Sequence, residues 1–128
     1  MDFHHVGIVT DDLDALAERY EAIFGLELVH EETLEQLRVG FIPLETGFFE
    51  LLEPIDDSGP IAGYLEQDGT TLHHFALAVS DIEQALAKAV DAGVSPIDET
   101  PRPGAWGHTV AFLQPGDTGG TLIEFVQE

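Results

Sequence analysis

The sequence contains no cysteine in its 128 residues. A fold without cysteine cannot use disulfide bonds or thiolate metal ligands, and a cytoplasmic location is the expectation for such a chain. No segment has the order of basic, apolar and small residues that marks a signal peptide. No apolar run approaches the ~18 residues needed to span a bilayer. We therefore expect a cytoplasmic protein with no membrane partner.

Basic residues are almost as scarce as cysteine. Four of them, Arg19, Arg38, Lys88 and Arg102, stand against 25 acidic residues, giving a formal net charge of −21. This balance argues against nucleic acid and anionic membranes as partners, because both would be repelled. The acids are spread through a chain that is 44% hydrophobic, which indicates a folded protein rather than an acidic tail. So acidic a surface is typical of a halophilic protein, which we expect here. At ~1 M salt the Debye length is about 3 Å, so the repulsion among surface carboxylates is screened.

The chain has the length of one domain, and its second half repeats the pattern of its first. "FHHVGIV" at residues 3–9 matches "LHHFALAV" at 72–79, and "FFELLE" at 48–53 matches "LIEFVQ" at 122–127. Each HH strand is followed by an aspartate and an amphipathic helical pattern, closed by Gly25 in the first half and by Gly93 in the second. The sequence therefore predicts two related modules.

Strand-like segments follow each predicted helix, separated by proline, glycine and aspartate turn signals. They cover residues 26–30, 37–44 and 47–52 in the first half, and 94–97, 108–113 and 121–126 in the second. Both halves are thus predicted to be βαβββ. We expect a single domain over 1–128, made of a first module at 1–55, a connector with a short helix beginning at Pro60 in 56–71, and a second module at 72–128.

Side chains alternate between the two faces of a strand, so the second histidine of each pair shares a face with small residues. His5 lies with Gly7, and His74 lies with Ala76, which leaves room for a ligand. Glu50 and Glu124 each stand inside an apolar strand, where a carboxylate is costly unless it is paired or binds a metal.

If the two modules are related by a pseudo-two-fold axis, these four residues converge on one His2Glu2 site. Nitrogen and oxygen ligands without sulfur suit Mn, Co, Ni, Fe(II) or Zn, which the ligand set does not distinguish. A single strand histidine is more often a hydrogen-bonded structural residue, and a single buried glutamate usually has a cationic partner. Two of each at matching positions, in a chain with four cations, favour the metal site.

Other polar residues are expected to have secondary roles. Arg38 and Arg102 lie in or beside strands and are candidates for substrate binding at the rim, although they could equally be solvated surface charges. His108 follows a glycine-rich turn and could reach the site. The first histidine of each pair, His4 or His73, is expected to be structural or to support a ligand, and His30 is expected in a loop or strand.

These motifs resemble the vicinal oxygen chelate (glyoxalase/bleomycin resistance) superfamily, and within it the methylmalonyl-CoA epimerase family, over essentially the whole chain. The resembling segments are "HHVGIVTDDLDALAERY", "FFELLEP", "DSGPIAGYLEQDGTTLHHFALAV" and "PRPGAWGHTVAFLQPGDTGGTLIEF". The resemblance implies an α+β fold in which two tandem βαβββ modules form an open β-cup, with helices outside, around a divalent ion. It also implies that His5, Glu50, His74 and Glu124 are the metal ligands.

The activity implied by the resemblance is interconversion of (R)- and (S)-methylmalonyl-CoA. The C2 proton is removed and returned on the other face, with Glu124 as one catalytic acid/base. Some epimerases carry a second catalytic glutamate where this chain has Val39, so the second group is unassigned; Glu45, His108 or a bound water are candidates. Many relatives also have a lysine where this chain has Gly116, a cation that could meet the phosphates of an acyl-CoA.

Two alternatives remain at this stage. A glyoxalase I-type lactoylglutathione lyase would use the same His/Glu set on a glutathione hemithioacetal. A non-enzymatic resistance module would sequester a small molecule but would have no use for four metal ligands. Such modules commonly form homodimers, and Phe48, Phe49 and Phe112 could serve an interface as well as a core.

Overall fold

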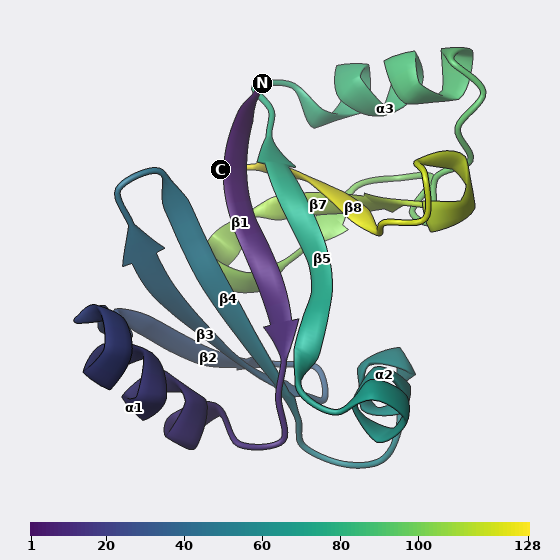
Figure 1. The fold of residues 1–128 in the computed structure, drawn as a ribbon. Helices are drawn as coiled ribbons and strands as arrows, with labels where there is room; N and C mark the ends of the chain where they lie inside the picture. The colour runs from purple at the N-terminus through teal and green to yellow at the C-terminus, as the bar shows by residue number, and fades with distance from the viewer. The chain divides into compact units, whose positions relative to one another are not determined.

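The structure is a computed structural model that describes all residues, 1–128. Its elements, in chain order, are β1 (Asp2–Val9), α1 (Leu13–Phe24), β2 (His30–Leu34), β3 (Leu37–Leu44), β4 (Gly47–Pro54), α2 (Pro60–Asp68), β5 (Thr71–Ala78), α3 (Ile82–Asp91), β6 (Arg102–Pro103), η1 (Ala105–Gly107), β7 (Thr109–Leu113), η2 (Pro115–Asp117) and β8 (Ile123–Gln127). Figure 1 shows these elements along the chain. No helix is both long enough and apolar enough to cross a membrane.

The chain forms two compact units. One contains residues His5–His73 and is called the N-terminal module below; the other contains His74–Glu128 together with Met1–His4 and is called the C-terminal module. The N-terminal module has the order β1, α1, β2, β3, β4, followed by α2, and the C-terminal module has the order β5, α3, β6, β7, β8. The predicted βαβββ pattern is therefore confirmed in both halves.

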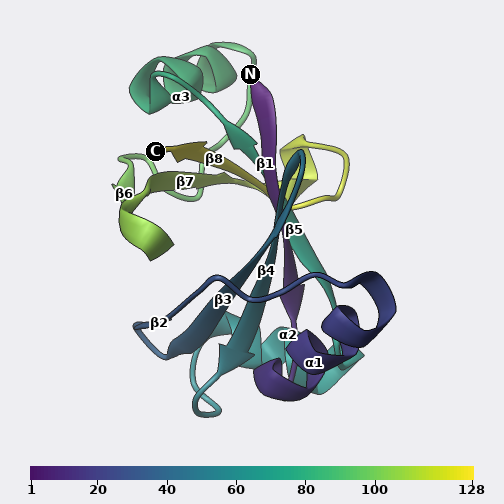
Figure 2. The ribbon, with the colours of Figure 1, turned by 90° about the vertical axis from the view of Figure 1, so that its left-hand side faces the viewer.

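In the N-terminal module, β2 pairs antiparallel with β3, β3 pairs antiparallel with β4, and β4 pairs parallel with β1. One face of this sheet packs against α1 through a core of Ile8, Leu13, Ile42 and Leu51, and Figure 2 shows α1 beside these strands. Gly40 lies close under Leu28 on this face, since a Cβ there would stand 2.7 Å from the Leu28 Cδ1 and that side chain would have to move. The other face of the sheet carries His5 and Glu50.

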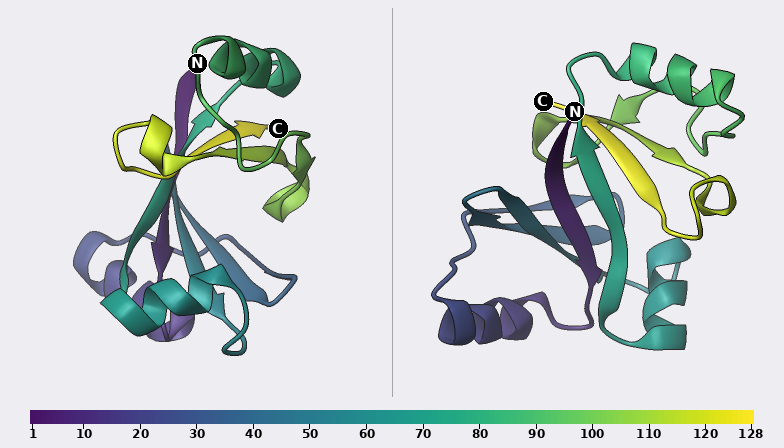
Figure 3. Two further views of the ribbon diagram at one scale, coloured as in Figure 1. Left: turned by 90° about the vertical axis from the view of Figure 1, so that its right-hand side faces the viewer. Right: turned by 45° about the horizontal axis from the view of Figure 1, so that its top comes forward.

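The C-terminal module repeats this arrangement. β6 pairs antiparallel with β7, β7 antiparallel with β8, and β8 parallel with β5. Helix α3 packs on one face through Ile82, Leu86, Ala111, Leu113 and Phe125, as Figure 3 shows for α3 beside β7 and β8. The opposite face carries His74 and Glu124.

The helix boundaries follow the predicted caps. The carboxylate of Asp12 accepts a hydrogen bond from the Ala15 N–H, and α1 ends at Gly25 in a left-handed conformation. Asp81 caps α3 in the same way through the Gln84 N–H. The predicted short helix after residue 59 is α2, with Pro60 in its first turn. These caps satisfy backbone groups that the helix itself cannot pair.

Three strand predictions were wrong in position. The segment 26–30 is not a strand, because Leu26 and Leu28 pack into the core under α1 and β2 begins only at His30. The segment 94–97 is reduced to a single bridge between Pro96 and Leu113, since proline lacks the N–H that a ladder needs. The two-residue strand β6 takes the edge position instead, and β8 begins at Ile123 rather than at 121.

Candidate functional site

In the N-terminal module, strands β1 and β4 bring His5 beside Glu50. Glu50 stands opposite Gly7 on β1 and opposite Phe41 on β3, so the pair shares one face of the sheet. The His5 Nε2 lies 3.3 Å from the Glu50 Oε1, and both residues are buried, at 2% and 7% exposure. The Phe41 ring packs edge-on against the His5 ring, 6.1 Å between centroids. The Phe41 ring thus supports His5, and Gly7 leaves space beside Glu50 because it has no side chain.

The C-terminal module holds the same arrangement at His74 and Glu124. Glu124 stands opposite Ala76 on β5 and opposite Phe112 on β7. The His74 Nε2 lies 3.2 Å from the Glu124 Oε1, with exposures of 4% and 6%. The Phe112 ring packs edge-on against His74 at 5.3 Å. Each module therefore repeats the histidine, the glutamate, the small residue and the supporting phenylalanine.

The geometry of each pair fits metal ligands. Two ligand atoms bound at right angles, each ~2.1 Å from one ion, are about 3 Å apart, close to the two observed separations. Imidazole nitrogen with carboxylate oxygen suits borderline divalent cations such as Zn, Co, Ni, Mn or Fe(II). The four residues that the sequence nominated as ligands thus form one suitably spaced pair in each module.

Arg38 lies on the opposite face of the sheet from His5 and Glu50. On β3 it shares a face with Gly40 and Ile42, the face covered by α1, and it stands on the opposite side from Phe41 and Glu50. Its guanidinium donates hydrogen bonds to Asp14 at 2.9 Å and to Glu31 at 2.8 Å. Because Arg38 donates these hydrogen bonds to Asp14 and Glu31, its pKa is raised, and the bond that Asp14 accepts lowers the pKa of Asp14. We therefore no longer propose Arg38 for substrate binding.

Arg102 lies on the face that carries His74 and Glu124. It stands opposite Val110 on β7, two residues from Phe112 along the same face. Its Nε donates to the Asp98 carboxylate at 2.9 Å, and its guanidinium lies 5.6 Å from the centre of the Phe112 ring. The same ring contacts His74, so Arg102 is one side chain removed from a candidate ligand. The two arginines that looked equivalent in the sequence are separated by the alternation of the strands.

His108, just before β7, lies against His4 in the C-terminal module. The two rings meet edge-on at 5.1 Å, and the His4 Nε2 lies 2.8 Å from the Glu128 Oε1. His108 precedes Phe112 by four residues, which corresponds to about 13 Å along a strand. The structure thus places His108 in a group with His4 and Glu128.

His30 and Glu32 form a second pair on the N-terminal face, which the sequence pattern did not predict. The His30 Nε2 lies 2.8 Å from the Glu32 Oε1, and both side chains are 28% exposed. His30 stands opposite Phe41, and Glu32 stands opposite Val39, so both share the face of His5 and Glu50. The signal was the two-residue spacing within a strand, which was obscured because the strand was predicted four residues too early.

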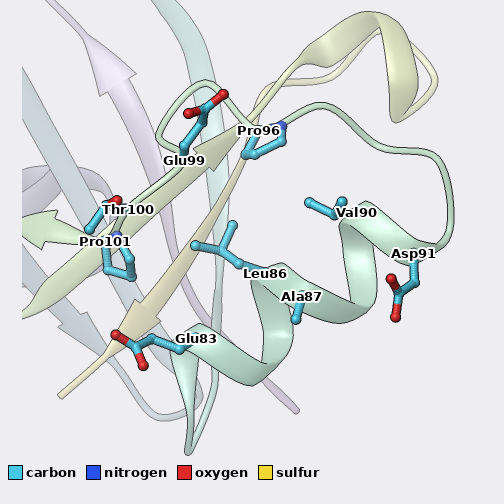
Figure 4. A pocket seen from close by; sticks show the side chains of 9 residues that line it. All are labelled: Glu83, Leu86, Ala87, Val90, Asp91, Pro96, Glu99, Thr100 and Pro101. Carbon is cyan, nitrogen blue, oxygen red and sulfur yellow. The ribbon is translucent and has the colours of Figure 1, made fainter.

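One cavity of about 420 Å³ lies in the C-terminal module between α3 and the segment before β6, with Leu86, Val90, Pro96 and Pro101 in its lining. Figure 4 shows the carboxylates of Glu83, Asp91 and Glu99 around it. Leu86 belongs to the core under α3, so this cavity is on the helix side of the sheet, away from His74 and Glu124. Three carboxylates and no cation in the lining make it unfavourable for an anionic ligand.

Comparison with known proteins gives the same picture over nearly the whole chain. The model of the glyoxalase/bleomycin resistance protein/dioxygenase superfamily matches residues 4–112. An ethylmalonyl-CoA/methylmalonyl-CoA epimerase of Cereibacter sphaeroides is 36% identical, covering 97% of this chain and 96% of the relative. The uncharacterized protein YqjC of Bacillus subtilis is 34% identical, covering 96% and 89%.

A solved structure supports the fold. A variant of Streptomyces coelicolor methylmalonyl-CoA epimerase in complex with 2-nitronate-propionyl-CoA superimposes with a TM-score of 0.96 at 30% identity, covering 100% of this chain and 94% of that one. The duplicated βαβββ modules, the family match and this likeness agree. The chain belongs to the glyoxalase/bleomycin resistance protein/dioxygenase superfamily and has its vicinal oxygen chelate fold.

Proposed function

We propose that the chain is a methylmalonyl-CoA epimerase that interconverts the (R) and (S) forms of its substrate at C2. The observation that carries this proposal is the His–Glu pair repeated in both modules, 3.3 Å apart at His5 and Glu50 and 3.2 Å apart at His74 and Glu124. The similarity to proteins named methylmalonyl-CoA epimerase supports the choice of substrate.

His5, Glu50, His74 and Glu124 would together hold one divalent cation. When bound, the cation would act as a Lewis acid that stabilises the negative charge developing on the thioester oxygen. Phe41 and Phe112 would fix the rings of the two histidines and so keep the ligands in place before substrate arrives. The small residues Gly7 and Ala76 would leave space for the acyl group beside the glutamates.

Glu124 would exchange the proton at C2 on one face of the substrate. Its carboxylate is 6% exposed, against the His74 ring and opposite Phe112, in surroundings that exclude most water. A general base in such a position removes the proton without competition from bulk solvent. A second group must deliver a proton to the opposite face, because inversion requires both faces of the same carbon.

Arg102 would meet an anionic part of the acyl-CoA. It is the arginine on the face of His74, whereas Arg38 is engaged on the helix side by Asp14 and Glu31. Asp98 already neutralises part of its charge, so its contribution would be modest.

An enzyme with a formal net charge of −21 would repel an anionic coenzyme in dilute buffer. We therefore propose that it works in concentrated salt, where screening shortens the range of this repulsion to about 3 Å at ~1 M. The same screening would allow a homodimer of so acidic a chain. Phe49 packs against Tyr20, Phe48 against Phe41 and Phe112 against His74, and all three phenylalanines are half-buried, so they serve the core and still offer surface to an interface.

The test is proton NMR of methylmalonyl-CoA in D2O at molar salt with protein loaded with Co²⁺ or Mn²⁺. We expect the C2 proton to exchange with solvent, a chelator to stop the exchange, and Glu124→Gln to reduce it by at least about a hundredfold. No exchange by folded, metal-loaded protein would contradict the proposal. Turnover of a glutathione hemithioacetal by that sample would identify a lactoylglutathione lyase instead.

A further inference from the structure

A second group of metal-binding side chains lies in the C-terminal module. His4 comes from β1, His108 precedes β7, and Glu128 follows β8. One ligand atom from each lies within 4.8 Å of the others. His4 is 4% exposed, and its Nε2 faces the Glu128 carboxylate at 2.8 Å. None of the three belongs to the His–Glu pairs described above.

We propose that His4, His108 and Glu128 bind a divalent transition-metal cation such as Zn²⁺, Ni²⁺ or Co²⁺. Two imidazoles and one carboxylate are a typical set of three protein ligands, with solvent completing the coordination. A tetrahedral zinc ion needs ligand atoms about 3.4 Å apart, so the His4 and Glu128 ligand atoms, now 2.8 Å apart, must separate slightly to admit the ion. Glu128 is 64% exposed in its side chain, and its rotation can supply that movement without disturbing the buried His4.

Electrostatics favour a cation at this position, because the group lies in a chain with a formal net charge of −21. The two histidines differ in their freedom. His4 is fixed by burial and by its contact with Glu128, whereas His108 is half-buried and meets His4 edge-on. One ligand is therefore preorganised, which lowers the entropic cost of closing the site around an ion.

Trp106 provides a reporter for this site. Its ring lies 6.2 Å from the His108 ring, and it is the one tryptophan in the sequence. A paramagnetic ion such as Ni²⁺ or Co²⁺ held by His108 should quench its fluorescence. The signal is independent of enzymatic activity and does not depend on the proposed function.

The experiment titrates chelator-treated full-length protein with Ni²⁺, following heat by calorimetry and Trp106 fluorescence in parallel. We expect quenching to saturate with one ion at this site. His108→Gln or Glu128→Gln should each lower the affinity of the quenching ion by at least about tenfold. His74→Gln should leave the quenching unchanged, and His73→Gln, which removes a histidine packed on Tyr64, is the matched control. Unchanged quenching in both His108→Gln and Glu128→Gln, with circular dichroism showing intact folds, would overturn the proposal.

Discussion

The carboxylate of Glu53 accepts a hydrogen bond from the backbone N–H of Leu13 at 2.6 Å. Gln127 does the same for Ile82 at 2.8 Å in the other module. In each case the last strand of a module supplies a side chain to the first turn of its helix. The repeat therefore extends beyond the metal-ligand candidates to the way each helix is fastened to its sheet.

This fastening predicts a stability cost for removing either side chain. Glu53→Ala and Gln127→Ala should each lower the free energy of unfolding by about 1–2 kcal/mol, because a helix N–H loses its acceptor. Denaturant unfolding at molar salt measures the loss. Glu53→Gln keeps an acceptor oxygen and should retain most of the stability; an equal loss in that variant would point to charge rather than capping.

The contact between Arg38 and Asp14 predicts a shift in a carboxyl titration. Arg38→Gln should return the pKa of Asp14 upward toward its ordinary value, since the hydrogen bond from Arg38 holds it down. A lowered carboxyl pKa contributes stability above its ordinary pKa and loses it as pH falls through the lowered value. Carbon-detected NMR titration reads the pKa directly. The same variant should turn over substrate normally, and a lost activity would return Arg38 to the site.

Removing Arg102, unlike removing Arg38, is expected to weaken substrate binding. Arg102→Gln should raise KM for the acyl-CoA by up to about tenfold, or ~1.4 kcal/mol, with little change in kcat. The glutamine keeps a donor for Asp98 and limits structural effects. Steady-state kinetics measures KM for Arg102→Gln and for Arg38→Gln side by side. Identical KM values for the two variants would exclude a role of Arg102 in substrate binding.

The charge predicts a requirement for salt. Dilution from about 2 M to 0.1 M KCl should reduce stability or unfold the protein, since the Debye length grows from a few ångströms to about 10 Å. Circular dichroism during dilution measures the transition. A neutral osmolyte such as sucrose at equal osmolality should protect less well. Full stability at 0.1 M would show that the acidic surface is not an adaptation to salt.

The sequence was most informative where two signals coincided. An aspartate before a helical period predicted the start of a helix in both halves, and the structure shows Asp12 and Asp81 as the two N-caps. His5 and His74 stood beside small residues, and the strands bring each next to a glutamate. Alternation along a strand is local, so the sequence alone can specify it.

Features that depend on register between strands were harder to predict. The face of Arg102 follows from its pairing with Val110 in a two-residue strand that the sequence did not predict. The pairing of Glu32 with Val39 depends on a strand start that the apolar residues before it obscured. His108 and Glu128 are separated along the chain and meet His4 through tertiary packing.

The short strand β6 has a consequence for solubility. It ends the C-terminal ladder with only two residues, one of them Pro103, and so offers few free N–H groups to another chain. In concentrated salt, charge repulsion cannot keep exposed sheet edges apart, because it is screened over a few ångströms. Protection from edge-to-edge aggregation must then come from backbone geometry. A truncated, proline-containing edge gives that protection under the ionic conditions in which acidic side chains would fail to provide it.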